Sequence, residues 1–191
     1  MSERRGGPPP NHTIAPPAPS ADTDSPPTVP DERATSADAA QALAERCVAR
    51  MLAHDAFSRW LGLEVLSVRP DAVTVRMTVR QEMLNGFGVC HGGVTFALAD
   101  SALAFAANTH GRVTLSVENG ISYPAPVRAG DVLTAEARQE SGGQRVVFFR
   151  VLVRRHDGDT VAIFRGTVYR TGRPLLDEGA ADDSVSDPAP Q

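Results

Sequence analysis

The feature that most constrains the fold is an apolar segment at residues 94–109, in which Asp100 is the only charged residue among 16. Its length and its alanine and leucine content predict a helix, and Asn108 and Gly111 are typical of a helix end. A helix at the surface would carry a polar stripe, and this one has none. We therefore expect the rest of the chain to enclose it on most sides.

Most of the remaining chain has the pattern of β-strands, which can supply that cover. Residues 63–68 and 73–80 predict a hairpin turning at Pro70-Asp71, and the second of these strands alternates apolar and polar residues. Four more strands are expected after the helix, at residues 113–123, 132–140, 145–155 and 160–170. Turn residues separate them, which favours a four-stranded meander. The order predicts an α+β domain, with a long central helix wrapped by a curved antiparallel β-sheet.

Two further expectations concern the surroundings of this sheet. Residues 40–61 predict one helix, and Phe57 and Trp60 near its end are expected in the core, with the wall of a pocket as the alternative. The strand at 145–155 carries large apolar residues on both faces. One face should cover the central helix, and the other should meet another subunit.

The two ends of the chain differ in composition from the middle. Residues 1–39 hold nine of the 15 prolines and predict a disordered tail. Residues 174–191 hold five acids and no base, and predict a disordered acidic tail. We therefore expect a single domain at residues 40–173. It contains 16 Arg against 12 acids, a balance of +4 that suits an anionic ligand.

Composition also excludes several kinds of chemistry. The chain has no lysine, which rules out Schiff-base and Walker-type lysine chemistry. Cys47 and Cys90 form no CxxC pair and the five histidines have no ligand spacing, so we expect no disulfide and no metal site. No apolar run reaches the roughly 18 to 20 residues that span a bilayer, and no motif indicates nucleic-acid binding. We expect a cytoplasmic protein.

The candidate site lies at and after the start of the apolar helix. His91-Gly92-Gly93 falls where free backbone N–H groups and the positive end of the helix dipole can stabilise an oxyanion. Asp100 is a carboxylate that an apolar helix tolerates only with partners. Simpler interpretations remain: the glycines form a turn, and Asp100 caps a loop or pairs with an arginine.

Three segments together resemble a known family. The sequence Met83-Leu-Asn-Gly-Phe-Gly-Val-Cys-His-Gly-Gly-Val-Thr-Phe-Ala-Leu-Ala-Asp-Ser-Ala-Leu-Ala-Phe-Ala-Ala-Asn108 closely resembles the PaaI-type phenylacetyl-CoA thioesterase family of hotdog-fold enzymes. The resemblance continues through residues 121–131 and 161–166 and covers about residues 57–170. It implies a hotdog fold and a homodimer or homotetramer.

The resemblance also implies roles for individual residues. Asp100 would activate a water molecule or attack the thioester itself, the Gly92 amide would polarise the thioester carbonyl, and Asn85 would help to place water or substrate. Asp100 and the loop from Asn85 to Gly92 would come from different subunits, so the active site would lie at the dimer interface. No cofactor is needed, because a thioester is already an activated acyl group. The segment Leu103-Ala-Phe105 departs from the family pattern and is expected to reshape the acyl pocket.

Other residues are candidates for holding the substrate. His91 and Gly93 are expected to fix the loop or orient the thioester. Arg128 is a candidate for a coenzyme A phosphate, as are Arg112 and Arg145. Cys90 next to His91 does not predict a catalytic thiol, because adjacent side chains seldom face one another.

The function favoured by these features is hydrolysis of an acyl-CoA substrate, with an aryl group like phenylacetyl or hydroxyphenylacetyl, or a medium-chain acyl group, as in phenylacetate degradation. Hydration of an enoyl-CoA is a second possibility, but it needs an Asp–His pair that the sequence does not offer. A third is a non-catalytic module that binds acyl-CoA and recruits a partner through its proline-rich tail. The carboxylate at Asp100 argues against that module.

Overall fold

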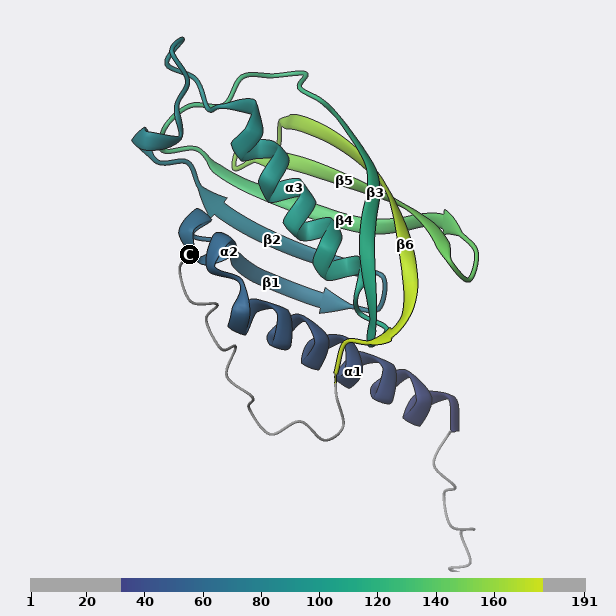
Figure 1. Ribbon diagram of the computed structural model, residues 1–191. Helices are drawn as coiled ribbons and strands as arrows, with labels where there is room; N and C mark the ends of the chain where they lie inside the picture. The colour runs from purple at the N-terminus through teal and green to yellow at the C-terminus, as the bar shows by residue number, and fades with distance from the viewer. Residues whose placement is uncertain (1–31, 177–191) are drawn as a thin grey trace, which may run out of the picture. The chain divides into compact units, whose positions relative to one another are not determined.

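The computed structural model describes residues 32–176 of the 191, so most of both expected tails lies outside the described residues. The elements, labelled in Figure 1, are α1 (Glu32–His54), α2 (Ala56–Leu61), β1 (Glu64–Arg69), β2 (Ala72–Thr78), a 3-10 turn (Gln81–Met83), α3 (Gly92–Ala107), β3 (Arg112–Ser122), β4 (Val132–Gly142), β5 (Val146–Arg155) and β6 (Thr160–Pro174). The central helix and all six expected strands are present, with ends within four residues of those predicted.

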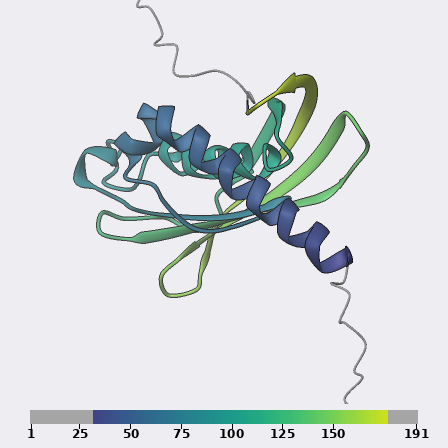
Figure 2. The same cartoon turned by 90° about the horizontal axis from the view of Figure 1, so that it is seen from below.

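The six strands form one antiparallel sheet with the order β1-β2-β4-β5-β6-β3, and α3 lies across its curved face (Figures 1 and 2). Helix α3 contacts β2, β3, β4, β5 and β6. The α+β prediction, a long helix wrapped by a curved antiparallel sheet, is therefore confirmed. The sheet is open, with β1 at one edge and β3 at the other.

Burial on α3 shows which side of the helix remains uncovered. Half of its residues are buried, including Leu98, Ala102 and Leu103, and they pack against inward-facing side chains of the sheet. A stripe of half-buried residues runs along the remaining face, through Ala97, Asp100, Ser101 and Ala104. These side chains are small and only partly covered within the chain, which leaves room for another protein surface to pack against them.

The N-terminal helical region differs from the prediction in two ways. The helix begins at Glu32, eight residues before the expected start. No proline follows Pro30 in this part of the chain, so nothing prevents the helix from starting this early. It also breaks at Asp55, whose carboxylate accepts a hydrogen bond from the Ser58 N–H at 2.9 Å and caps α2. The single helix expected at residues 40–61 is therefore two helices.

The predicted four-stranded meander is wrong in the position of β3. This strand pairs with β6 at the far edge of the sheet, whereas β4 pairs with β2 and β5. Consecutive strands usually pair, but the connection from Tyr123 to Asp131 is long enough to pass over the start of α3. The Cys90 N–H donates to the Val127 carbonyl at 2.7 Å and ties this connection to the loop before α3.

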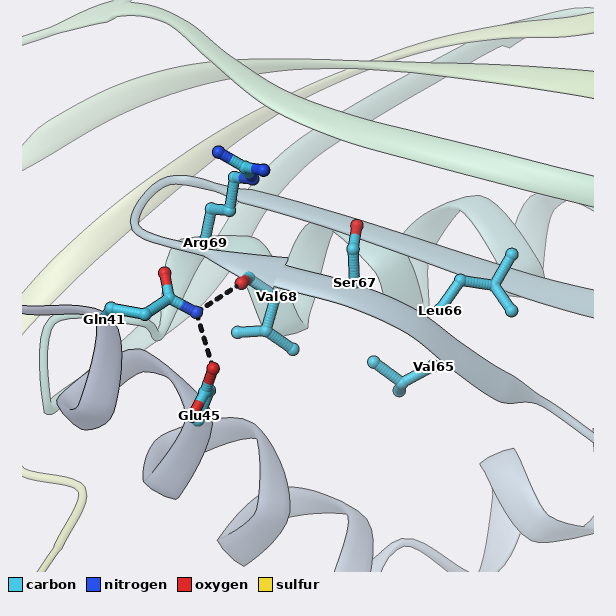
Figure 3. Close-up of a pocket in the computed structure, with 7 residues that line it drawn as sticks. All are labelled: Gln41, Glu45, Val65, Leu66, Ser67, Val68 and Arg69. Carbon is cyan, nitrogen blue, oxygen red and sulfur yellow. Dashed lines mark hydrogen bonds between the residues drawn. The ribbon is translucent and has the colours of Figure 1, made fainter. Parts of the chain in front are cut away.

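Helix α1 is attached to the edge strand β1, as Figure 3 shows. The Gln41 Nε2 donates to the Val68 carbonyl at 2.7 Å and to the Glu45 carboxylate at 2.7 Å. The hollow beside this contact has a volume of about 610 Å³ and is lined only by residues of α1 and β1. It includes none of the candidate site residues.

Phe57 and Trp60 are not in the core, contrary to the prediction. Their exposed fractions are 52% and 53%, because α2 directs Ser58 and Leu61 inward instead. The two rings stack with centroids 5.8 Å apart, and the Arg80 guanidinium lies 5.3 Å from the Trp60 ring centroid. Ring stacking and a cation–π contact therefore stabilise these two exposed side chains in place of packing in the core.

The outer face of the sheet is apolar on β5, as expected. Val146 and Phe148 are 43% and 46% exposed, while their neighbours Val147 and Phe149 are buried on the inner face. Within residues 32–176, no helix combines the length and apolarity needed to cross a bilayer.

Candidate functional site

The start of α3 is held in place by His91. This residue caps the helix in an extended conformation (φ −61°, ψ 131°), and its Nδ1 accepts a hydrogen bond from the Gly93 N–H at 2.9 Å. The His91 N–H donates to the Met83 carbonyl at 2.9 Å. His91 thus fixes the loop to the helix, and the Gly93 N–H is already bonded within the chain.

The Gly92 N–H, in contrast, has no hydrogen-bond partner among the described residues. The Gly92 carbonyl accepts a hydrogen bond from the Tyr123 hydroxyl at 2.8 Å, so the peptide between Gly92 and Gly93 is held from both sides. A free amide at the first position of a helix also benefits from the positive end of the helix dipole. This geometry leaves one oriented donor, the Gly92 N–H, at the N-terminal end of α3.

Asn85 organises the loop that leads to this donor. Its Oδ1 accepts hydrogen bonds from the N–H groups of Phe87 at 2.9 Å and Val89 at 3.4 Å. Its own N–H donates to the Val89 carbonyl at 2.8 Å. The Nδ2 of Asn85 makes no hydrogen bond within residues 32–176 and is the atom left for a ligand.

A pocket of about 350 Å³ opens beside Gly92, between the start of α3 and the Tyr123 to Val127 segment. Cys90 and Thr95 line it together with Val89 and Val161. Burial raises the pKa of the Cys90 thiol, and its Sγ lies 3.8 Å from the Thr95 hydroxyl rather than beside a histidine nitrogen. The structure therefore forms no Cys–His pair here.

Asp100 is half-buried two turns further along α3, and its partner is neither an arginine nor a loop N–H group. Its Oδ1 accepts a hydrogen bond from the Asn119 Nδ2 at 2.8 Å. Burial raises the pKa of the Asp100 carboxyl, and the hydrogen bond from Asn119 opposes that shift. A carboxylate in this setting is a better proton acceptor than an exposed aspartate.

Within one chain, the free amide and the carboxylate lie far apart. Gly92 and Asp100 are separated by eight residues of continuous helix, which corresponds to about 12 Å along the helix axis. Both groups must come within about 3 Å of the same reacting group to act together. A single chain does not bring them together.

The three candidate arginines are divided between the two ends of α3. Arg128 is exposed in the connection that borders the pocket beside Gly92, where its backbone N–H donates to the Asp131 carboxylate at 2.8 Å. Arg112 and Arg145 line a different hollow, together with Arg170. Arg112 follows the C-terminal end of α3, so it is about a helix length, roughly 24 Å, from Gly92. Among the described residues, no cluster of His, Cys, Asp or Glu has the arrangement of a metal site.

Sequence reasoning missed Asn119 and Tyr123, which contact Asp100 and Gly92. Asn119 lies in β3 and Tyr123 directly follows this strand, so both contacts depend on the position of β3 at the edge of the sheet beside β6. One signal was available for the first of them. Gly166 is an isolated glycine inside an expected strand, which indicates a close approach of another segment, and the segment that approaches it contains Asn119.

Comparison with known proteins agrees with this architecture. Residues 87–162 match the family model of the thioesterase superfamily. The chain is 36% identical to the acyl-coenzyme A thioesterase PaaI of Escherichia coli K12 over 128 residues, which are 67% of this chain and 91% of that protein. The solved structure of the E. coli PaaI protein from the phenylacetic acid degradation operon superposes with a TM-score of 0.69 at 34% identity, covering 70% of this chain and 97% of that one.

A more distant structure shows a ligand. A hypothetical thioesterase from Streptococcus pneumoniae TIGR4, solved with coenzyme A, superposes with a TM-score of 0.57 at 25% identity and covers 59% of this chain and 88% of that one. The PaaI relative is matched over nearly its whole length, and His91-Gly92-Gly93 and helix α3 lie within the residues 87–162 that match the family model. The chain therefore belongs to the PaaI-type family of the thioesterase superfamily and has its hotdog fold.

Proposed function

We propose that this protein hydrolyses acyl-CoA thioesters to the free acid and coenzyme A. The observation that carries this proposal is the pair of groups on α3: a free, oriented amide at Gly92 and a half-buried carboxylate at Asp100 with no cationic partner. A thioester needs a polarised carbonyl and a base, and its thiolate is a good leaving group. These residues supply both requirements without a cofactor.

In the proposed mechanism, the Gly92 N–H donates to the thioester carbonyl oxygen. Asp100 takes a proton from a water molecule as that water attacks the carbonyl carbon, and the Asn85 Nδ2 helps to place the water or the substrate. The tetrahedral oxyanion is stabilised by the Gly92 amide and collapses with cleavage of the C–S bond. The proton on Asp100 passes to the departing coenzyme A thiolate. Direct attack by Asp100 through a mixed anhydride uses the same two groups.

The active site is proposed to form between two copies of the chain. The distance of about 12 Å along α3 between Gly92 and Asp100 supports this arrangement, because it separates the two groups within one copy. The half-buried stripe on α3 and the open edge of β3 offer surfaces for a partner. The apolar outer face around Val146 and Phe148 supports further association into a homotetramer.

An aryl or medium-chain acyl group is the proposed substrate class. The apolar walls of the pocket beside Gly92 and its volume of about 350 Å³ support a group of this size. The relationship to a PaaI protein from a phenylacetic acid degradation operon favours phenylacetyl-like groups. Leu103 and Phe105 are buried in the core of the chain, so their departure from the family pattern affects the pocket through packing. Arg128 is the proposed contact for a coenzyme A phosphate.

The test is thiol release from phenylacetyl-, 4-hydroxybenzoyl- and hexanoyl-CoA by the purified full-length chain. Turnover of at least one substrate is expected. Binding of these compounds without turnover would instead support the non-catalytic acyl-CoA module.

The shared site is tested by mixing two inactive variants, Asp100→Asn and Gly92→Pro, after dissociation and reassembly. If each site combines groups from two chains, random mixing restores roughly a quarter of wild-type activity, because half of the dimers are mixed and each holds one complete site. No recovery would show that each chain carries its own site.

A further inference from the structure

Asn119 on β3 uses its two polar atoms very differently. Its Nδ2 donates to the Asp100 Oδ1 at 2.8 Å, while its Oδ1 is buried and has no hydrogen-bond partner. A buried carbonyl without a donor lowers the stability of the folded state, and an apolar side chain of the same size would avoid that cost. The contribution of Asn119 to folding therefore does not explain its presence.

The surroundings of Asn119 hold its amide in one orientation. Gly166 on β6 lies opposite Asn119 in the strand register. A Cβ at residue 166 would lie 2.7 Å from the Asn119 Oδ1 and 2.6 Å from the Leu103 Cδ2, so the amide rests against the bare backbone of this glycine. Turning the amide over would place its carbonyl against the Asp100 carboxylate and bury an unpaired donor. Only the observed orientation suits an ionised Asp100.

We propose that Asn119 is a positioning residue for the hydrolysis described above: it fixes Oδ1 of the ionised Asp100 and leaves Oδ2 to accept the proton of the attacking water. This inference rests on the proposed function. The Asp100 Oδ2 has no hydrogen-bond partner within residues 32–176, which agrees with this division of the two oxygens.

The electrostatics around Asp100 give Asn119 a second effect. Burial raises the pKa of Asp100, and the hydrogen bond from Asn119 lowers it, with no contribution from a charged group. The charged residues beside Asn119 and Gly166 in sequence, Glu118 on β3 and Arg165 on β6, are both exposed. Asn119 thus extends the pH range in which Asp100 is ionised toward lower pH.

The test compares Asn119→Leu, which keeps the number and branching of the side-chain heavy atoms but removes the donor, with the wild type in the full-length protein. We expect kcat to fall about 10- to 100-fold, as for a misplaced base that has lost a charge-assisted hydrogen bond. The acidic limb of the kcat/KM profile should move to higher pH, since the donor no longer favours the ionised base. The Tm should be unchanged or higher, because the variant removes the unpaired carbonyl.

Asn119→Asp provides a second variant of nearly the same size. A second carboxylate beside Asp100 should move the acidic limb to still higher pH through like-charge repulsion. Glu118→Gln is the matched control, because it removes a charge from the next residue of β3 without touching Asp100. It should leave kcat and the pH profile unchanged.

The outcomes separate this inference from the proposed function. Loss of activity in Asp100→Asn, together with a normal kcat and pH profile in Asn119→Leu, would overturn the role of Asn119 alone. A lower Tm of Asn119→Leu with an unmoved pH profile would assign a purely structural role and also overturn it. Full activity of Asp100→Asn would refute the proposed base, and the inference with it.

Discussion

Replacing Gly166 by alanine should damage both the fold and the site, because this glycine is where β6 meets Leu103 and Asn119. The added Cβ would lie 2.6 Å from the Leu103 Cδ2 and 2.7 Å from the Asn119 Oδ1, both far inside normal contact distance. The Leu103 methyl can move only within a packed core, since Leu103 is fully buried. The Asn119 amide can move only by giving up its bond to Asp100.

The size of the effect follows from this overpacking. One extra methyl group in a well-packed core costs about 1 to 3 kcal/mol in the free energy of unfolding. For a domain of roughly 150 residues, this corresponds to a fall in Tm of about 2 to 4 °C for each kcal/mol. Moving Asn119 away from Asp100 should also lower kcat about tenfold or more, for the reason given for Asn119→Leu.

The assay pairs thermal unfolding with thiol release at saturating substrate. Gly172→Ala is the matched control on the same strand, because nothing lies within 4 Å of the position of its added Cβ. It should change the free energy of unfolding by less than about 0.5 kcal/mol. Wild-type Tm and kcat in Gly166→Ala would refute the packing argument and the link between Gly166, Asn119 and Asp100.

Three further predictions concern α3. Gly92→Pro removes the free N–H at a helix position that accepts proline, so kcat should fall about 100-fold or more. Gly92→Ala keeps the N–H, and its kcat should fall much less. Equal kcat values for the two variants would reject the amide as the oxyanion donor. Asn108→Ala should lower the free energy of unfolding, measured in urea, by about 2 to 4 kcal/mol, because the Asn108 side chain is only 4% exposed and bonds both the N–H and the carbonyl of buried Thr114. A loss below about 1 kcal/mol would show that water replaces the two hydrogen bonds of this side chain. Because burial raises the folded-state pKa of Asp100, the wild type loses stability as pH rises through the interval between the unfolded-state and folded-state pKa values. Asp100→Asn should therefore have the higher Tm at pH 7 and lose that advantage as pH falls below about 3.9, the pKa of an unperturbed aspartate. A difference in Tm that stays constant at all pH values would contradict the raised pKa.

Local sequence patterns predicted the elements well and their arrangement less well. The apolar segment around Leu98 and Leu103 predicted an enclosed helix, because burial on nearly all sides leaves no polar stripe. The position of β3 was missed because pairing of neighbouring strands is only a tendency and the connection after Tyr123 is long. The exposure of Trp60 was not predicted, because its cation–π partner Arg80 lies 20 residues away in the sequence.

The same distinction applies to the site. Asp100 and Gly92 stand out in the sequence because a charge within an apolar helix and paired glycines at its start are local anomalies. Asn119 does not, because its contact with Asp100 spans 19 residues and needs the β3–β6 register and the bare backbone at Gly166. Contacts of this kind become visible only once the sheet is assembled.

The most direct test of the account is the rate of thiol release by Asp100→Asn at pH 7, measured beside the wild type on the substrate that the wild type hydrolyses best. Asparagine keeps the volume and can still accept the hydrogen bond from Asn119, but it cannot take a proton from water. We predict that kcat falls by about two orders of magnitude or more, as expected for the loss of a catalytic base. Equal rates for the two proteins would contradict the assignment of Asp100 as the catalytic carboxylate.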